Sequence, residues 1–107
     1  MNSANEFGVP LAKDVRVTQE TLTVDLNDGR CLSVPLAWFP RLMTGSRRER
    51  SHWRLIGEGD GVHWTDLDED ISVEGLLAGR MSGESSRSLQ QWLDARPARR
   101  VRRGRSA

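Results

Sequence analysis

The sequence predicts a small α+β domain in which an antiparallel meander of about five short strands packs against short helices. Three observations lead to this fold class. Apolar residues alternate with polar ones in several short runs, as in strands with one buried face. An Asp-Gly pair separates two of these runs, and this pair is a strong signal for a β-hairpin. Apolar residues at helical spacing occur only in short segments that begin at a proline or serine, and two of these segments end at a glycine.

The N-terminal half is expected to contain the hairpin. Residues 1–12 show no strand or helix pattern, and we expect them to form a flexible arm. A first strand is predicted around residues 15–17, where two valines alternate with polar residues. The alternating runs at residues 22–26 and 32–34 are joined through Asp28-Gly29. This pair favours a type I′ turn, because that turn needs a positive φ at both central residues.

Two short helices are expected after the hairpin. Pro40 suits the first turn of a helix, where its missing N–H costs nothing, and Gly45 is expected to end that helix. The apolar face of this helix is predicted to hold three residues: Phe39, Leu42 and Met43. Ser46 and Glu49 have the spacing of a capping box, which predicts a second helix from Arg47 to about His52.

Further strands are predicted on either side of a glycine-rich turn. Residues 53–56 and 62–64 have the composition of strands, and residues 57–61 contain too many glycines for regular structure. Residues 65–70 are expected to form an acidic loop. The second half of the chain therefore continues the antiparallel meander.

Helices are also predicted toward the C-terminus. Ser72 is a good N-cap for a helix that Gly79 closes, and Asp70 is expected to stabilise the N-terminus of this helix through its negative charge. Residues 81–95 are predicted to form a linker followed by a short helix, whose apolar positions are Leu89, Trp92 and Leu93. Residues 96–107 combine a proline with an arginine run, and we expect a disordered tail there.

Composition excludes several classes of protein. Hydrophobic residues make up 36% of the chain and charged residues 29%, which is typical of a globular domain. No apolar run is long enough to span a membrane, and the N-terminus lacks the pattern of a secretory signal. Cys31 is the single cysteine, so no intrachain disulfide can form, and we expect a cytoplasmic protein. Its place in a strand pattern predicts a half-buried small hydrophobic residue.

The small net charge of +1 hides an uneven distribution. Six of the sixteen basic residues are arginines in the last twelve positions, where no acidic residue occurs. Residues 1–94 therefore hold ten basic and fifteen acidic residues, which gives the body a charge of about −5 and the tail +6. A tail of this kind can bind phosphate, dock on an acidic partner or simply be solvated.

Five motifs in a fixed order resemble one bacterial family, the domain of unknown function 2442. The segments that carry the resemblance are Leu26 to Arg30, Val34 to Leu42, Arg47 to Trp53, Gly61 to Trp64, and Leu67 to Gly79. The resemblance covers about residues 12–80, and we expect the α+β domain itself to span residues 13–80. It implies an antiparallel sheet and gives little biochemistry.

The same resemblance implies a protein partner that is encoded by a neighbouring gene. Members are similar to proteins encoded beside a second small family, the domain of unknown function 4160, and such pairs look like toxin–antitoxin modules with this family as the antitoxin. Some members carry a helix-turn-helix domain after this one. The residues after Gly79 are too few for such a domain, so direct reading of an operator is not expected.

No residue pattern predicts catalysis, a metal or a cofactor. His52, His63 and Cys31 lack the paired spacing of zinc ligands, and His63 is expected to be a partly exposed surface residue. The acidic loop 66–70 has oxygens that a divalent cation could use, but it lacks the EF-hand pattern, so a structural role is expected. Neither a nucleophile elbow nor a phosphate-binding loop is present.

The candidate binding residues fall into two groups. Tryptophan and arginine are common anchors of protein interfaces, which makes one group a candidate partner surface on the folded body: Trp38, Phe39, Arg41, Trp53 and Trp64. Core packing is an equally valid interpretation of these residues. The second group are the tail arginines, which are candidates for nucleic-acid binding: Arg96, Arg99, Arg100, Arg102, Arg103 and Arg105.

Two functions therefore remain open from the sequence. The first is a non-enzymatic protein that binds a small protein partner, such as the antitoxin-like member of a two-protein module. The second is a nucleic-acid-associated regulator that uses its arginine-rich tail. The sequence leaves the partner and the oligomeric state undetermined.

Overall fold

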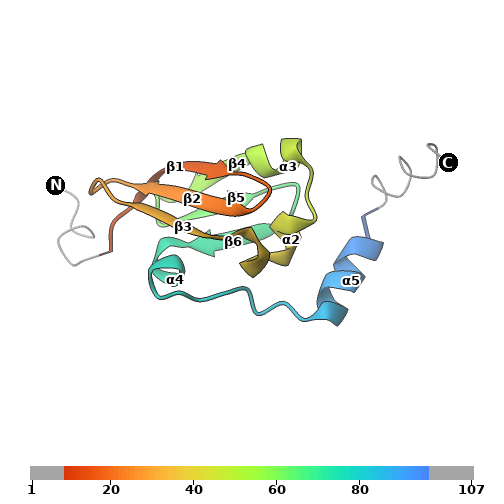
Figure 1. The fold of residues 1–107 in the computed structure, drawn as a ribbon. Helices are drawn as coiled ribbons and strands as arrows, with labels where there is room; N and C mark the ends of the chain where they lie inside the picture. Colours follow the sequence, from red (N-terminus) through yellow and green to blue (C-terminus); the bar gives the residue numbers. More distant parts are fainter. Residues whose placement is uncertain (1–8, 97–107) are drawn as a thin grey trace.

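The structure is a computed structural model that describes residues 9–96, and its fold is α+β (Figure 1). Two three-stranded antiparallel sheets contain all the strands of this part of the chain, in the orders β1-β2-β3 and β4-β5-β6. The strands are β1 (Ala12–Val17), β2 (Thr21–Leu26), β3 (Cys31–Pro35), β4 (Trp53–Ile56), β5 (Gly61–Trp64) and β6 (Glu69–Ser72). The helices are η1 (Leu36–Trp38), α2 (Pro40–Met43), α3 (Arg47–Ser51), α4 (Val73–Leu77) and α5 (Ser86–Asp94). The α+β class and the antiparallel meander are confirmed, with the strands divided between two sheets.

The first sheet has one apolar and one polar face. Alternate residues of β2 are buried, and the strand register places Val15 and Leu32 on the same face as Val24. Cys31 lies on the opposite face and is exposed, so the expected half-buried position is wrong. The reason is the alternation itself, because Leu32 takes the inward position of this strand and turns Cys31 toward solvent.

The Asp-Gly hairpin is confirmed, but its turn differs from the predicted type I′. Among the residues of this turn only Gly29 has a positive φ, of 96°. Gly29 N–H donates to Leu26 O at 3.2 Å, and Leu26 N–H donates to Arg30 O at 2.8 Å. The connection is therefore a three-residue loop with glycine in the left-handed position, the second common solution for a hairpin.

The short helices begin at the predicted caps. Pro40 is in the first turn of α2, and Ser46 forms a capping box with Glu49 at the start of α3. Ser72 accepts a hydrogen bond from Gly75 N–H and caps α4. Phe39 and Leu42 are buried as expected, whereas Met43 is 43% exposed, because α2 is a single turn and only part of its surface meets the core.

The acidic loop predicted at residues 65–70 is shorter in the structure, because its last two residues belong to the second sheet. Only residues 65–68 form a turn, and Glu69 and Asp70 belong to β6, which pairs with β5. Asp70 binds the His63 ring through its carboxylate rather than the N-terminus of α4. The cause is the strand register, which places Asp70 directly opposite His63. His63 is partly exposed, as predicted, because its neighbours Val62 and Trp64 take the inward face.

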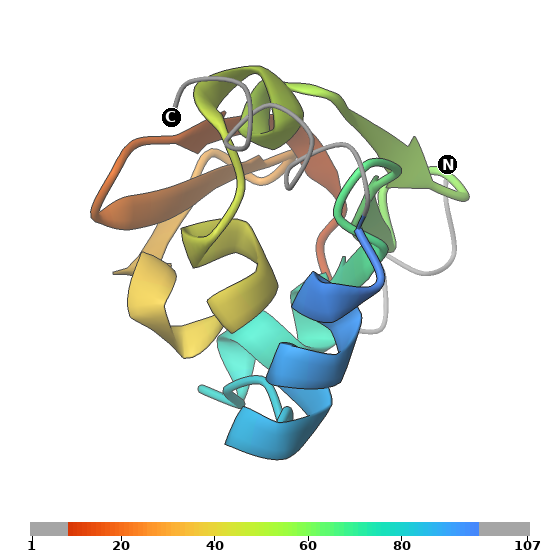
Figure 2. The ribbon, with the colours of Figure 1, turned by 90° about the vertical axis from the view of Figure 1, so that its right-hand side faces the viewer.

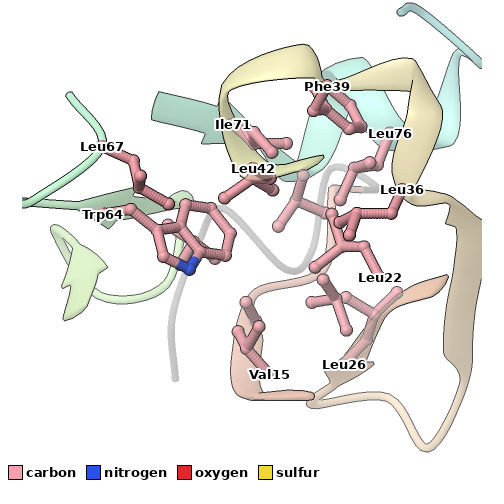
Figure 3. Close-up of a cluster of buried hydrophobic side chains, with 14 residues drawn as sticks. Val15, Leu22, Leu26, Leu36, Phe39, Leu42, Trp64, Leu67, Ile71 and Leu76 are labelled. Atoms are coloured by element: carbon pink, nitrogen blue, oxygen red, sulfur yellow. The ribbon is translucent and has the colours of Figure 1, made fainter. Parts of the chain in front are cut away.

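One hydrophobic core joins both sheets and the helices (Figure 3). Leu22 and Leu26 come from the first sheet, Trp64 from the second, and Leu36 and Leu42 from the segment between them, and all five are fully buried. Trp64 Nε1 donates to Arg50 O at 2.9 Å, which satisfies the polar atom of this buried ring. The core therefore fixes the relative position of the two sheets.

The last helix, α5, lies at one end of the molecule beside α2 (Figures 1 and 2). It begins at Ser85, whose side chain accepts from Ser88 N–H, and none of its residues is fully buried. Across the described residues, no helix has the length and apolar character that a membrane span requires. Trp92 packs against the edge of the core, and long polar side chains complete the attachment of α5 to the body.

Candidate interaction surface

Two of the five residues predicted for partner binding belong to the core. Trp64 has no exposed surface, and Phe39 is 5% exposed. A buried side chain cannot anchor a partner without unfolding of the domain, so neither residue belongs to the candidate surface. For these two residues the core interpretation is the correct one.

The other two aromatic candidates are half-buried and lie on different elements. Trp53 begins the edge strand β4, opposite Trp64 of β5. Trp38 is the last residue of η1, and its carbonyl oxygen accepts a hydrogen bond from Ser82 N–H at 3.0 Å. Both rings pack against the core with part of their surface in solvent. Trp38 is therefore placed beside the segment that leads to α5.

Arg41 is the centre of a polar network at this end of the molecule. Its Nε and Nη2 donate to the two carboxylate oxygens of Glu84 at 2.7 and 2.9 Å, a bidentate pair. Its Nη1 donates to the carbonyl oxygen of Asp68 at 3.0 Å. The Glu84 side chain is only 8% exposed, so this pair is shielded from water. Arg41 thus connects α2, the turn before β6 and the segment before α5.

Trp92 of α5 lies against two arginines. The guanidinium of Arg41 is 4.8 Å from the centre of the Trp92 ring, and that of Arg96 is 4.6 Å from it. Arg96 also donates to the carboxylate of Glu49 on α3. Cation–π contacts of this kind contribute about 0.5–2 kcal/mol each. Together these contacts hold α5 on the body through charge and ring stacking.

The carboxylates around Arg41 titrate differently. The hydrogen bonds from Arg41 hold the pKa of Glu84 below its usual range. Burial raises the pKa of Glu69 to about 7, although the charge of Arg41 opposes this shift. Glu69 is half-buried and, within the described residues, accepts no hydrogen bond. Glu84 is therefore ionised at neutral pH, whereas Glu69 gains and loses its proton near pH 7.

Apolar side chains border the network. Met81 is 59% exposed and precedes Ser82, which is hydrogen-bonded to Trp38. The segment 81–84 therefore connects an exposed methionine and the backbone of a half-buried tryptophan to the carboxylate that pairs with Arg41. We call this set the tryptophan–arginine surface; its members are Trp38, Arg41, Met81, Glu84 and Trp92.

The arginine tail lies mostly beyond the described residues. Five of its predicted nucleic-acid contacts fall in that region: Arg99, Arg100, Arg102, Arg103 and Arg105. Arg96 is described, and its side chain is only 14% exposed. It is engaged with Glu49 and Trp92, so it is a poor candidate for contact with phosphate, which corrects its assignment to the tail.

The histidines each bind one carboxylate. His52 pairs with Asp66 at 2.7 Å, and His63 pairs with Asp70. No group of three or more potential metal ligands comes together in the region that the structure describes. Cys31 donates to Asp25, which raises the pKa of the thiol. These groups are spread over the surface rather than gathered in one cleft.

Sequence patterns do not identify Trp92, Glu49 or Glu84 as members of this network. Trp92 was recognised only for its helical spacing, and Glu49 only for its capping box. Glu84 carried no signal, because its partner Arg41 is 43 residues away in sequence. A pairing of this kind is set by the tertiary fold and has no local pattern.

These features define a class: a small α+β domain of two antiparallel sheets, with a charged aromatic network at one end. The chain belongs to the family described as Protein of unknown function (DUF2442), whose model matches residues 12–82. The helix α5 follows the matched segment, so Trp92 and Arg96 are additions to the part that the family model describes.

Two solved structures are similar to this chain. A crystal structure of a protein of unknown function from Rhodospirillum rubrum is 30% identical, with a TM-score of 0.61 over 70% of this chain and 93% of the other. The solution structure of an uncharacterized protein from Chromobacterium violaceum is 19% identical, with a TM-score of 0.64 over 83% of this chain and 82% of the other. The second shares the fold. A comparison with curated proteins finds no match.

Proposed function

We propose that the chain is a non-enzymatic protein of the bacterial cytoplasm that binds a small protein partner, as the antitoxin-like member of a two-protein module. The resemblance that the sequence motifs carry suggests the kind of partner, a small toxin encoded nearby. In this role the protein neutralises the toxin by covering part of its surface.

The observation that carries the proposal is the tryptophan–arginine surface. Tryptophan and arginine dominate the binding energy of protein interfaces, because each buries much area and keeps a polar group. Here Trp38 and Trp92 are half-buried, and Met81 adds a flexible apolar side chain that is 59% exposed. The bidentate pair of Arg41 with Glu84 keeps the centre of this surface in one geometry.

Growth of cells that express the neighbouring gene tests the proposal. Expression of the neighbour alone is expected to arrest growth, and co-expression of this chain is expected to restore it. A control chain with Leu42→Asp, which disrupts the core, should not restore growth. The antitoxin role is wrong if the neighbour is harmless, or if it is toxic and this chain neither binds nor neutralises it.

A second function, binding of nucleic acid, is favoured by the position of Arg96. Its bond to Glu49 places the start of the arginine tail beside α3, where Arg47 and Arg48 are exposed. A tail that begins next to two surface arginines can extend one phosphate-binding surface. Deletion of residues 97–107, which leaves Arg96 in place, tests this function. Retention of the shortened protein on immobilised DNA at low salt should fall sharply. Unchanged retention would exclude nucleic-acid binding through the tail.

A further inference from the structure

The outer edge of β6 has backbone groups without partners. Val73 N–H donates to Asp60 O at 3.0 Å, so the Gly61–Ser72 pair is of the non-hydrogen-bonded type. The alternation of antiparallel pairing then turns Glu69 and Ile71 toward β5, and turns the main-chain groups of Asp70 and Ser72 toward the free edge. In the part of the chain that the structure describes, the two outward N–H groups and the Asp70 carbonyl bind no other group.

A groove of about 280 Å³ runs along this edge. All four residues of β6 line it, although their side chains alternate between the two faces of the sheet, so the groove must follow the backbone edge. Phe39 and Leu76 also line the groove, together with residues 80–83. Met81, the most exposed apolar residue of the tryptophan–arginine surface, is one of these lining residues.

Glu69 provides the groove with a half-buried carboxylate at β6, and Arg80 is the basic residue among the lining residues. The Glu69 carboxylate accepts no hydrogen bond from the described residues, and its oxygens are not fully buried. Burial accounts for its pKa of about 7, because the charge of Arg41 offsets the lost hydration only in part. A guanidinium or ammonium group that entered the groove would supply a partner and restore ionisation. The Asp70 carboxylate lies on the opposite face of the strand and binds His63, so Glu69 is the carboxylate that would meet the incoming charge.

We propose that this groove binds an extended segment of the protein partner that carries an arginine, which adds to β6 as a fourth strand and pairs with Glu69. Main-chain hydrogen bonds to Asp70 and Ser72 supply affinity, as in other cases of strand addition. The arginine supplies selectivity through a charge-assisted bond to the half-buried carboxylate. The inference rests on the proposed function, because it assigns the surface that the protein partner occupies.

Amide exchange of the full chain tests the proposal with defined peptides. The probe is a capped Thr-Val-Arg-Val-Thr peptide, and the matched control replaces its arginine with glutamate. The arginine peptide is expected to slow exchange of the Asp70 and Ser72 amides at least tenfold at saturation. The Ile71 amide already bonds to β5 and serves as an internal reference. Glu69→Gln is expected to weaken binding of the arginine peptide severalfold, whereas Asp14→Asn on the other sheet should leave it unchanged.

The outcomes separate the inference from the proposed function. Equal binding of both peptides would overturn the groove as the binding site. Changes in amide exchange that are spread over acidic residues, without protection of the Asp70 and Ser72 amides, would overturn it too. If the neighbouring gene product binds while these two amides stay unprotected, the inference fails and the proposed function stands. If the arginine peptide protects them and the neighbour does not bind, the proposed function fails, and so does the assignment of the groove to that partner.

Discussion

The guanidinium of Arg41 lies 4.8 Å from the centre of the Trp92 ring, which connects the family domain to the helix that follows it. Arg41 lies in α2 and Trp92 in α5, and no residue of α5 is fully buried. The attachment of this helix therefore depends on the ring and the charges around it.

Trp92→Ala is expected to release α5 from the body. The change removes both cation–π contacts and should lower the free energy of unfolding by about 1–2 kcal/mol. Amide exchange should accelerate across α5 and leave the strands unaffected. Gln91→Ala, at an exposed neighbouring position, is the control and should change neither quantity. If the amides of α5 are as well protected in the Trp92 variant as in the natural chain, the ring does not hold this helix.

Stability should depend on pH through Glu69. The pKa of this carboxyl is about 7 in the folded protein and near 4.5 in the unfolded chain, so the folded state holds the proton more tightly. The contribution of Glu69 to stability is therefore present below about pH 4.5 and is lost as the pH rises toward 7.

Glu69→Gln removes this dependence, because the amide does not titrate. Urea denaturation at several pH values should find the variant more stable than the natural chain at pH 8, and similar to it at pH 4.5. The same change in the free energy of unfolding between pH 5 and 7 in both proteins would show that Glu69 does not cause the effect.

Gly61→Ala is expected to damage the pairing of β5 with β6. A Cβ at this position would lie 2.7 Å from the backbone oxygen of Ile71, which a strand cannot easily move. We expect a loss of about 1–3 kcal/mol in the free energy of unfolding. Gly83→Ala meets no atom within 4 Å and is the matched control. Thermal denaturation of the two variants measures the difference, and equal melting temperatures would contradict the close approach.

The reactivity of Cys31 should report its bond to Asp25. The thiol is exposed, and its hydrogen bond to that carboxylate raises its pKa, so little thiolate forms at neutral pH. Asp25→Asn lowers the pKa of the thiol and is expected to speed alkylation by iodoacetamide at pH 7.5 severalfold. Asp14→Asn, on the same sheet, should not change the rate. Slower alkylation in the Asp25 variant would refute this account.

Local chemistry explains what could be predicted from the sequence. The capping box of Ser46, the hairpin at Gly29 and the proline start of α2 each depend on residues that are close in the chain. The predictions that failed depended on partners from elsewhere. Asp70 was assigned to a helix end that follows it closely, yet it binds His63 across the sheet.

The candidate site was less accessible to sequence reasoning. Arg41 was identified as a binding residue and Arg96 as part of a tail, and only the fold shows that both contact Trp92. Tryptophan has no pattern that separates core from surface, so the sequence left both interpretations of Trp64 open, and the structure places it in the core. Burial and long-range ion pairs are properties of the assembled structure.

The affinity of the chain for the product of the neighbouring gene tests the central claim most directly. Met81→Asp places a charge in the tryptophan–arginine surface, and Met43→Asp places one on an exposed methionine of α2 outside it. Calorimetry with the purified neighbour should show binding to the natural chain and to the Met43 variant, with affinity at least about tenfold weaker for the Met81 variant. Absence of binding to the natural chain, or equal binding to all three proteins, would contradict the account.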